Sequence, residues 1–319
     1  MHRSRLRSLI AALLALLLVL TACGISDTDE IEAEVEDQPL ALDLEEEPEE
    51  VTEEDDAAAE EDDEAAEFDL VAAVDAYVST IPEGWMFIRE ADEFADALAI
   101  EGAVVIDVRE PGEFAEGHIP GAINVPIRTL TQNLEVIPVD RPVWIYCLSG
   151  WRAGLATSSL RMIGYDNVTA YAPGSAGWEA AGNDLVTEDN QAETFGDPGF
   201  EPAMVAAVDD FLVTLPEGFL TNSLDEVQAA VDAGATLVDV RQPDEYDEGF
   251  LPDALSVPLR SIVSTDVEIP QDSPVIVYCQ SGFRAALSLP VLHVTGWTNV
   301  EGFPGSFAAW VEAGEAVMS

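Results

Sequence analysis

Short apolar runs alternate with amphipathic stretches along most of the chain. Residues 103–108 and 236–240 are apolar runs of the length and composition of buried strands. Residues 91–99 and 224–233 have the mixed pattern of amphipathic helices, and Ser223 is placed as an N-cap of the second. Strands that alternate with helices predict a parallel sheet covered by helices on both faces, which is an α/β fold.

This pattern occurs twice, because one half of the chain repeats the other. The tripeptide Asp-Val-Arg at 107–109 recurs at 239–241, and Cys147 recurs as Cys279, both at an offset of 132. The central part of the repeat therefore carries no net insertion. We expect two domains of the same fold, residues 68–195 and 196–319.

The first 22 residues have the features of a secretory signal. An arginine-rich start is followed by an apolar run at 9–20, which is shorter than the roughly 20 residues of a membrane-spanning helix. Leu20-Thr21-Ala22-Cys23 resembles the lipobox of bacterial lipoproteins, which implies cleavage before Cys23 and lipid on that cysteine. We expect a lipoprotein anchored outside the cytoplasmic membrane in a bacterial cell envelope. An uncleaved anchor helix is the alternative.

Acidic residues dominate residues 23–67. The whole chain has 63 Asp and Glu against 12 basic residues, for a formal net charge of −51. Such a run buries too little apolar surface to fold, and its like charges extend it, so we expect a disordered tether. Binding of metal or a partner by this run is the alternative. The charge balance disfavours nucleic acid as a partner.

One octapeptide of the repeat, residues 146–153 in the first copy and 278–285 in the second, has the features of a reactive-thiol loop. Each cysteine follows a short apolar run, and a helix-compatible stretch follows the loop. Loop and first-turn N–H groups, together with the helix dipole, favour a thiolate there. Glycine permits the backbone angles that the loop needs, and an arginine five positions after the cysteine adds a fixed positive charge. The loops are Leu148, Ser149, Gly150, Trp151 and Arg152 after Cys147, and Gln280, Ser281, Gly282, Phe283 and Arg284 after Cys279.

The number of cysteines limits their other uses. The chain has 3, and if Cys23 carries lipid, only Cys147 and Cys279 remain. We therefore expect no structural disulfide, no metal site and no cofactor. A Cys147–Cys279 disulfide and a purely structural role of buried cysteines are the alternatives, and recurrence of the whole loop favours the reactive role.

Several motifs in order resemble the rhodanese family. They are residues 107–114, residues 117–122 and the Cys147 loop in the first copy, and 239–241, 245–246, 249, 251–252 and the Cys279 loop in the second. The resemblance implies sulfur transfer with Cys147 and Cys279 as catalytic residues. Each cysteine would attack a sulfane-sulfur donor such as thiosulfate, become a persulfide, and pass the sulfur to a thiol or cyanide-type acceptor.

Two departures from the family pattern bear on the substrate. Leu148 and Gln280 stand where many thiosulfate-using members carry a basic residue, which favours a polysulfide or a persulfide as donor. In related phosphatases the arginine follows the cysteine by six positions, whereas here it follows by five. The smaller loop suits one sulfur atom better than a phosphoryl group.

Other residues of the motifs are expected to support the loops. We expect Trp151 and Phe283 to form apolar pocket walls or simple packing, His118 to be structural, and Trp178 and Trp310 to lie in the cores. Ion pairs are expected to brace the loops through Asp107, Arg109 and Glu113 and through Asp239, Arg241 and Glu245.

Both loops are intact, so neither domain is expected to be silent. The main rival hypothesis is a binding module that carries a persulfide or an anion without turnover and delivers it to a partner at the envelope. A scaffold recognised only through its protein contacts is the third reading.

Overall fold

The computed structural model describes residues 68–188 and 190–319, which lie in one compact unit. The signal peptide, the lipidation site Cys23 and the acidic tether predicted from the sequence lie outside the described residues. No helix in the described part of the chain has the length and apolar composition needed to cross a membrane.

The first domain has a five-stranded parallel sheet with strand order β1-β5-β4-β2-β3. Its elements in chain order are α1 (Leu70–Ser79), β1 (Phe87–Ile88), α2 (Ala91–Leu98), β2 (Val104–Asp107), α3 (Pro111–Glu116), β3 (Ile123–Asn124), η1 (Ile127–Val136), β4 (Val143–Tyr146), α4 (Trp151–Ile163), β5 (Val168–Tyr171) and α5 (Gly174–Ala180).

The second domain repeats this arrangement in a four-stranded parallel sheet with order β7-β6-β8-β9. A single bridge between Thr221 and Gly302 stands where the first domain pairs β1 with β5. Its elements are α6 (Pro202–Val213), α7 (Leu224–Asp232), β6 (Thr236–Asp239), α8 (Pro243–Glu248), β7 (Leu255–Ser256), η2 (Leu259–Ser261), β8 (Val275–Tyr278), α9 (Phe283–Val294), β9 (Val300–Gly302) and α10 (Ser306–Glu312).

The apolar runs form strands because both faces of each sheet are covered. Successive residues of a strand point to opposite faces. Val105 and Ile106, neighbours on β2, accordingly belong to two different buried clusters. Helix α7 begins at a capping box in which Ser223 and Glu226 bind each other's backbone N–H groups. The predicted fold of two parallel-sheet α/β domains is confirmed.

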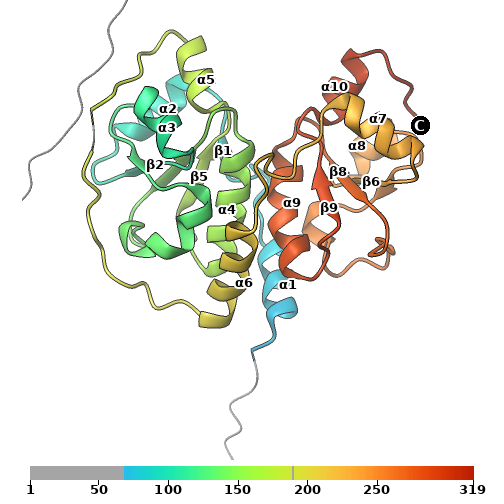
Figure 1. The fold of residues 1–319 in the computed structure, drawn as a ribbon, viewed down its shortest axis with the longest axis horizontal. Coiled ribbons are helices and arrows are strands. Elements are labelled where there is room, and N and C mark those ends of the chain that lie inside the picture. The colour runs from blue at the N-terminus through green and yellow to red at the C-terminus, as the bar shows by residue number, and fades with distance from the viewer. Residues whose placement is uncertain (1–67, 189) are drawn as a thin grey trace, which may run out of the picture. The chain divides into compact units, whose positions relative to one another are not determined.

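Helices α4 and α9 lie side by side where the domains meet (Figure 1). The Ser158 hydroxyl donates to the carbonyl oxygen of Leu287 at 2.7 Å. Gly154 allows this close approach, since a Cβ atom there would lie 2.7 Å from the Cβ of Ala286. One buried cluster contains residues of both domains, so the two domains share a core.

The first helix of each domain packs on the other domain. Helix α1 contacts η2, and α6 contacts η1. The Arg128 guanidinium donates from Nε to the carbonyl oxygen of Leu215 at 3.1 Å, and Arg260 donates in the same way to Ile81 at 2.7 Å. This reciprocal exchange brings the segment after each first helix close to the cysteine loop of the opposite domain.

Candidate active site

Each cysteine lies directly beyond the carboxyl end of a central strand. Cys147 follows β4 and Cys279 follows β8, and both are free thiols with 1% of their surface exposed. The Gly150 N–H donates to the Cys147 sulfur at 3.1 Å, and the Gly282 N–H donates to the Cys279 sulfur at 3.2 Å. Since α4 and α9 begin at the next residue, the helix dipole also favours negative charge on each sulfur.

Glycine is required at these two positions for a steric and a conformational reason. Gly150 has φ +93° and Gly282 has φ +96°, angles that L side chains rarely adopt. A Cβ atom at Gly150 would lie 2.2 Å from the carbonyl oxygen of Ala172, and one at Gly282 would lie 2.3 Å from that of Pro304. The same loop geometry is therefore built twice.

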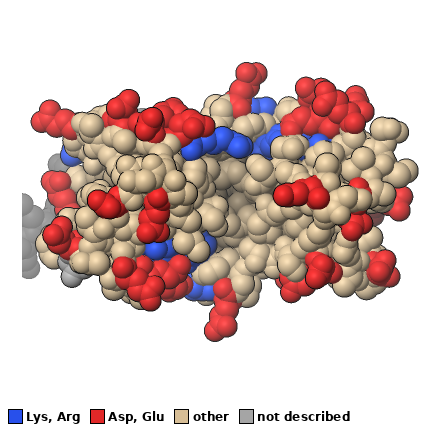
Figure 2. All heavy atoms as spheres, turned by 90° about the horizontal axis from the view of Figure 1, so that it is seen from above, with Lys and Arg blue, Asp and Glu red and all other residues tan. Residues whose placement is uncertain are grey.

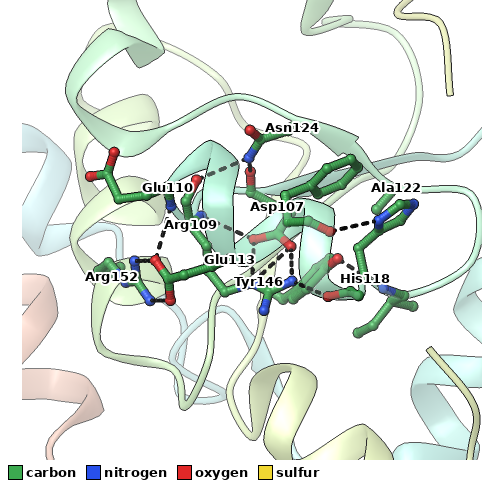
Figure 3. Close-up of polar contacts among 12 residues, drawn as sticks. Asp107, Arg109, Glu110, Glu113, His118, Ala122, Asn124, Tyr146 and Arg152 are labelled. Atoms are coloured by element: carbon green, nitrogen blue, oxygen red, sulfur yellow. Dashed lines mark hydrogen bonds and ion pairs between the residues drawn. The ribbon is translucent and has the colours of Figure 1, made fainter. Parts of the chain in front are cut away.

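The loop arginines are held by carboxylates of α3 and α8. Arg152 donates from Nη1 and Nη2 to Glu113 at 2.6 and 2.7 Å (Figure 3), and Arg284 makes the matching two contacts with Glu245. Burial lowers the pKa of Arg152, but the bonds to Glu113 and the electrostatic interaction with Cys147 outweigh burial and raise that pKa. Burial also lowers the pKa of Arg284, but the interactions with Glu245 and Cys279 outweigh burial and raise it.

These ion pairs also determine the net charge of the loops. The hydrogen bonds from Arg152 lower the pKa of Glu113, so this carboxyl is ionised at neutral pH. Each loop arginine is thus matched by a carboxylate. The pair adds no net positive charge to the loop.

The Asp-Val-Arg segments form buried ion pairs at the ends of β2 and β6. Asp107 accepts from Arg109 Nη2 at 2.6 Å, and this nitrogen also donates to the Gly117 carbonyl oxygen at 2.7 Å. Asn124 donates to the carbonyl oxygens of Asp107 and Arg109, both at 2.9 Å (Figure 3). The second domain repeats the pair between Asp239 and Arg241. These contacts fix the turn that leads from each strand to the helix with the loop's glutamate.

His118 and the two tryptophans lie in packed surroundings. His118 is fully buried, stacks on Phe114 with ring centres 3.7 Å apart, and places its ring nitrogens 3.1 and 3.0 Å from the carbonyl oxygens of Phe114 and Glu188. Trp178 and Trp310 are buried in the cores. The structure thus places none of the three next to a cysteine sulfur.

Trp151 and Phe283 lie at the contact between the domains. Trp151 donates from its indole nitrogen to the carbonyl oxygen of Phe219 at 2.8 Å. Phe283 packs edge-on against Phe87, with ring centres 4.6 Å apart. Both side chains are more than nine-tenths buried and also line a cavity between the loops, so the two roles considered from the sequence coexist.

The structure shows two aromatic residues that sequence reasoning missed. The Phe219 ring centre lies 5.0 Å from the guanidinium carbon of Arg152, and the Trp85 ring centre lies 5.0 Å from that of Arg284. Each ring therefore covers the loop arginine of the opposite domain at cation–π distance. Trp85 and Phe219 have φ of +56° and +51°, which is uncommon for aromatic residues.

Ser306 is a further residue missed from the sequence. Its hydroxyl accepts from the Cys279 backbone N–H at 3.1 Å and donates to the Phe303 carbonyl oxygen at 2.7 Å. Gly174 occupies the matching position of the first domain, with φ +64° against +52° for Ser306. Aligning the two repeats shows that serine replaces glycine here, but it does not show that the serine hydroxyl binds the Cys279 N–H.

The fold and the site define a class of protein. It is an α/β protein in which a buried cysteine after a parallel strand is held by the amide of a glycine at a helix start. The chain belongs to the rhodanese family: the family described as "Rhodanese-like domain" matches residues 90–181 and 223–313, more than half of the chain.

Relatives of known name agree with this membership. The 3-mercaptopyruvate sulfurtransferase of Escherichia coli K12 is 27% identical over 267 residues, which are 69% of this chain and 93% of that protein. A sulfurtransferase of Allochromatium vinosum is 36% identical over 83 residues, 26% of this chain and 78% of that protein. The uncharacterized protein YqhL of Bacillus subtilis is 42% identical over 76 residues, 24% of this chain and 60% of that protein.

Among solved structures, a thiosulfate sulfurtransferase from Pseudomonas aeruginosa is 28% identical, with a TM-score of 0.35. The match covers 76% of this chain and 47% of that one. This chain therefore spans about half the length of that relative.

Proposed function

We propose that the protein is a sulfurtransferase in which Cys147 and Cys279 each carry sulfur as a persulfide. One observation supports this most strongly. The same loop is built twice around a free, buried cysteine, with a glycine N–H 3.1 or 3.2 Å from the sulfur. A persulfide anion needs such a donor beside it in place of water.

The reaction is a double displacement at sulfur. The cysteine thiolate attacks the outer sulfur of the donor, and the bond between that sulfur and the rest of the donor breaks. The leaving group takes the electron pair, as sulfite from thiosulfate or as a thiolate from a persulfide. An acceptor thiolate then attacks the outer sulfur of the cysteine persulfide, which regenerates the cysteine thiolate and leaves the acceptor as a persulfide.

The charges around the loops favour a persulfide or polysulfide over thiosulfate as donor. The position after each cysteine is occupied by Leu148, which is 48% exposed, and by Gln280. Each loop arginine is already paired with a carboxylate, so the loop arginines themselves offer a small dianion little uncompensated positive charge. The relatives named for thiosulfate and 3-mercaptopyruvate thus define the reaction class for this proposal and leave the donor to experiment.

The near-complete burial of both sulfurs supports a second candidate function. A loop that closes around its thiol also suits a carrier, which loads once and releases sulfur only to a partner protein. Steady-state assays with thiosulfate, polysulfide and several thiol acceptors separate the two functions. An enzyme produces many equivalents of product, whereas a carrier stops after one equivalent per loaded cysteine.

Substitution of the two cysteines tests the sulfurtransferase proposal. We expect Cys147→Ser and Cys279→Ser each to remove part of the turnover, and the double variant to remove it at least 1000-fold, roughly the loss of a nucleophile. Full activity in the double variant would refute the sulfurtransferase proposal. It would also show that the activity does not depend on either cysteine as a sulfur carrier.

We also propose that the protein acts at the cell envelope through lipid on Cys23. The support is the arginine-rich start, the apolar run and the Leu20-Thr21-Ala22-Cys23 motif. We expect the mature protein to fractionate with membranes and Cys23→Ser to abolish the lipid mass on its first residue. An unlipidated wild-type protein in the soluble fraction would contradict this.

A further inference from the structure

Residues that follow the two cysteines in their loops border one cavity of about 430 Å³. Equivalent residues of the two loops line it: Ser149, Gly150 and Trp151 from the first, and Ser281, Gly282 and Phe283 from the second. The two glycines are the residues whose amides bind the cysteine sulfurs. A ligand in this cavity therefore lies next to both loops.

The cavity has one arginine that is not committed to a carboxylate. Six arginines in the described part of the chain form ion pairs with Asp or Glu, and Arg89 is not among them. Arg89 is exposed, lines the cavity from the end of β1, and places Nη2 3.5 Å from the Ser281 hydroxyl. A residue of the first domain thus lies against the cysteine loop of the second.

Glu90 lines the same cavity beside Arg89. The two are not joined by an ion pair within 4.0 Å, so the cavity presents a guanidinium and a carboxylate next to each other. In the second domain, the two residues before α7 that correspond to Arg89 and Glu90 are Asn222 and Ser223, which are uncharged. Figure 2, which views the molecule from above, shows basic side chains on either side of a central hollow and acidic ones spread over the surrounding surface.

We propose that this cavity binds a small thiol with an amino-acid head group, or its persulfide, and serves both cysteines. Arg89 binds the carboxylate and Glu90 binds the ammonium group of that ligand. The inference rests on the proposed sulfur transfer and adds the class of sulfur donor or acceptor. It also makes Arg89 a specificity-determining residue that one domain supplies to the other.

The size and the charges of the cavity support this ligand class. Small-molecule sites have volumes of roughly 300–1,000 Å³, so a cavity of about 430 Å³ suits a ligand larger than thiosulfate. Guanidinium groups bind carboxylates through paired hydrogen bonds. A head group with both charges is bound better by this pair of residues than a simple anion, which Glu90 repels.

Kinetics with three acceptor thiols test the inference in the full chain. Cysteine has both head-group charges, 3-mercaptopropionate only the carboxylate, and cysteamine only the ammonium group. We expect Arg89→Gln to raise KM about fivefold for cysteine and 3-mercaptopropionate but not for cysteamine, the effect of an exposed charge contact. Glu90→Gln is the matched control and should raise KM for cysteine and cysteamine while lowering it for 3-mercaptopropionate. Equal changes for all three thiols would overturn the inference.

Alkylation gives a second readout that needs no sulfur transfer. Iodoacetate and iodoacetamide differ by one negative charge, and peptide mass spectrometry gives the rate of each at Cys147 and Cys279. We expect Arg89→Gln to lower the iodoacetate-to-iodoacetamide rate ratio, most strongly at Cys279, and Glu90→Gln to raise it. An unchanged ratio in Arg89→Gln overturns the site even where sulfur transfer occurs. A responsive ratio without transfer to any thiol refutes the proposed function and, with it, the assignment of the ligand as a substrate.

Discussion

The guanidinium carbon of Arg284 lies 5.0 Å from the ring centre of Trp85, although the two residues belong to different domains. Phe219 has the same relationship to Arg152. Each of these arginines binds the glutamate of its own domain and is covered by an aromatic ring of the other. Each cysteine loop is thus completed by the opposite domain.

This exchange predicts crossed effects of substitution. We expect Phe219→Ala to slow persulfide formation at Cys147 about threefold to tenfold and to leave Cys279 little changed, since it removes the cation–π contact with Arg152 together with that of Arg128. Trp85→Ala should affect Cys279 in the same manner and spare Cys147. Peptide-resolved mass spectrometry after brief exposure to a donor measures both sites in one sample. Equal slowing of both cysteines by either substitution would show that the rings act only on folding.

Ser306 provides a prediction about the second loop alone. Ser306→Ala keeps the Cβ atom at a positive φ and leaves the buried Cys279 N–H without its acceptor, which should cost about 1–3 kcal/mol of unfolding free energy. Ser306→Gly loses the same hydroxyl but relieves backbone strain of about 1 kcal/mol, so it should be the more stable of the two. Denaturant unfolding measures the order. Greater stability of the alanine variant would contradict this account of Ser306.

The Glu113–Arg152 pair predicts how stability depends on pH. The folded-state pKa of Glu113 lies below its ordinary value of 4.5, chiefly because Arg152 donates to it. The stabilisation is therefore fully present above pH 4.5 and is lost as pH falls through the lower, folded-state pKa. We expect Glu113→Gln to flatten the fall in unfolding free energy below about pH 4.5 and to reduce stability at pH 7.

Glu245 offers an internal comparison for this pH dependence. Burial raises its pKa, but the hydrogen bonds from Arg284 and from the Gln242 backbone N–H, together with the charges of Arg284 and Arg241, outweigh burial and lower the pKa of Glu245. We expect Glu113→Gln combined with Glu245→Gln to make the fall in unfolding free energy below about pH 4.5 shallower than either change alone does. If the unfolding free energy of the double variant falls as steeply with decreasing pH as that of the wild type, these ion pairs are not the cause of the fall.

Local patterns were sufficient to predict much of the fold. The apolar runs at 103–108 and 236–240 became β2 and β6, and Ser223 caps α7 as expected. The cysteine loops were recognisable because their residues are adjacent in the chain and occur twice. Their chemistry depends mainly on backbone amides and a glycine, which a short motif specifies.

The contacts between domains could not be predicted in this way. Trp85, Arg89 and Phe219 lie in segments without a regular period, and their contacts are with residues far away in the chain. The positive φ of Trp85 and Phe219 is a tertiary effect that no propensity of tryptophan or phenylalanine indicates. The close packing of α4 on α9 requires glycine at position 154. A single glycine in a helical sequence does not by itself indicate a contact with another helix.

Peptide mass spectrometry of the protein after treatment with polysulfide or thiosulfate tests the central claim most directly. We expect a mass increase of about 32 Da, one sulfur atom, on the peptides of both Cys147 and Cys279, removed by an added thiol. Absence of this adduct from both cysteines with every donor would contradict the proposal that the two loops carry sulfur.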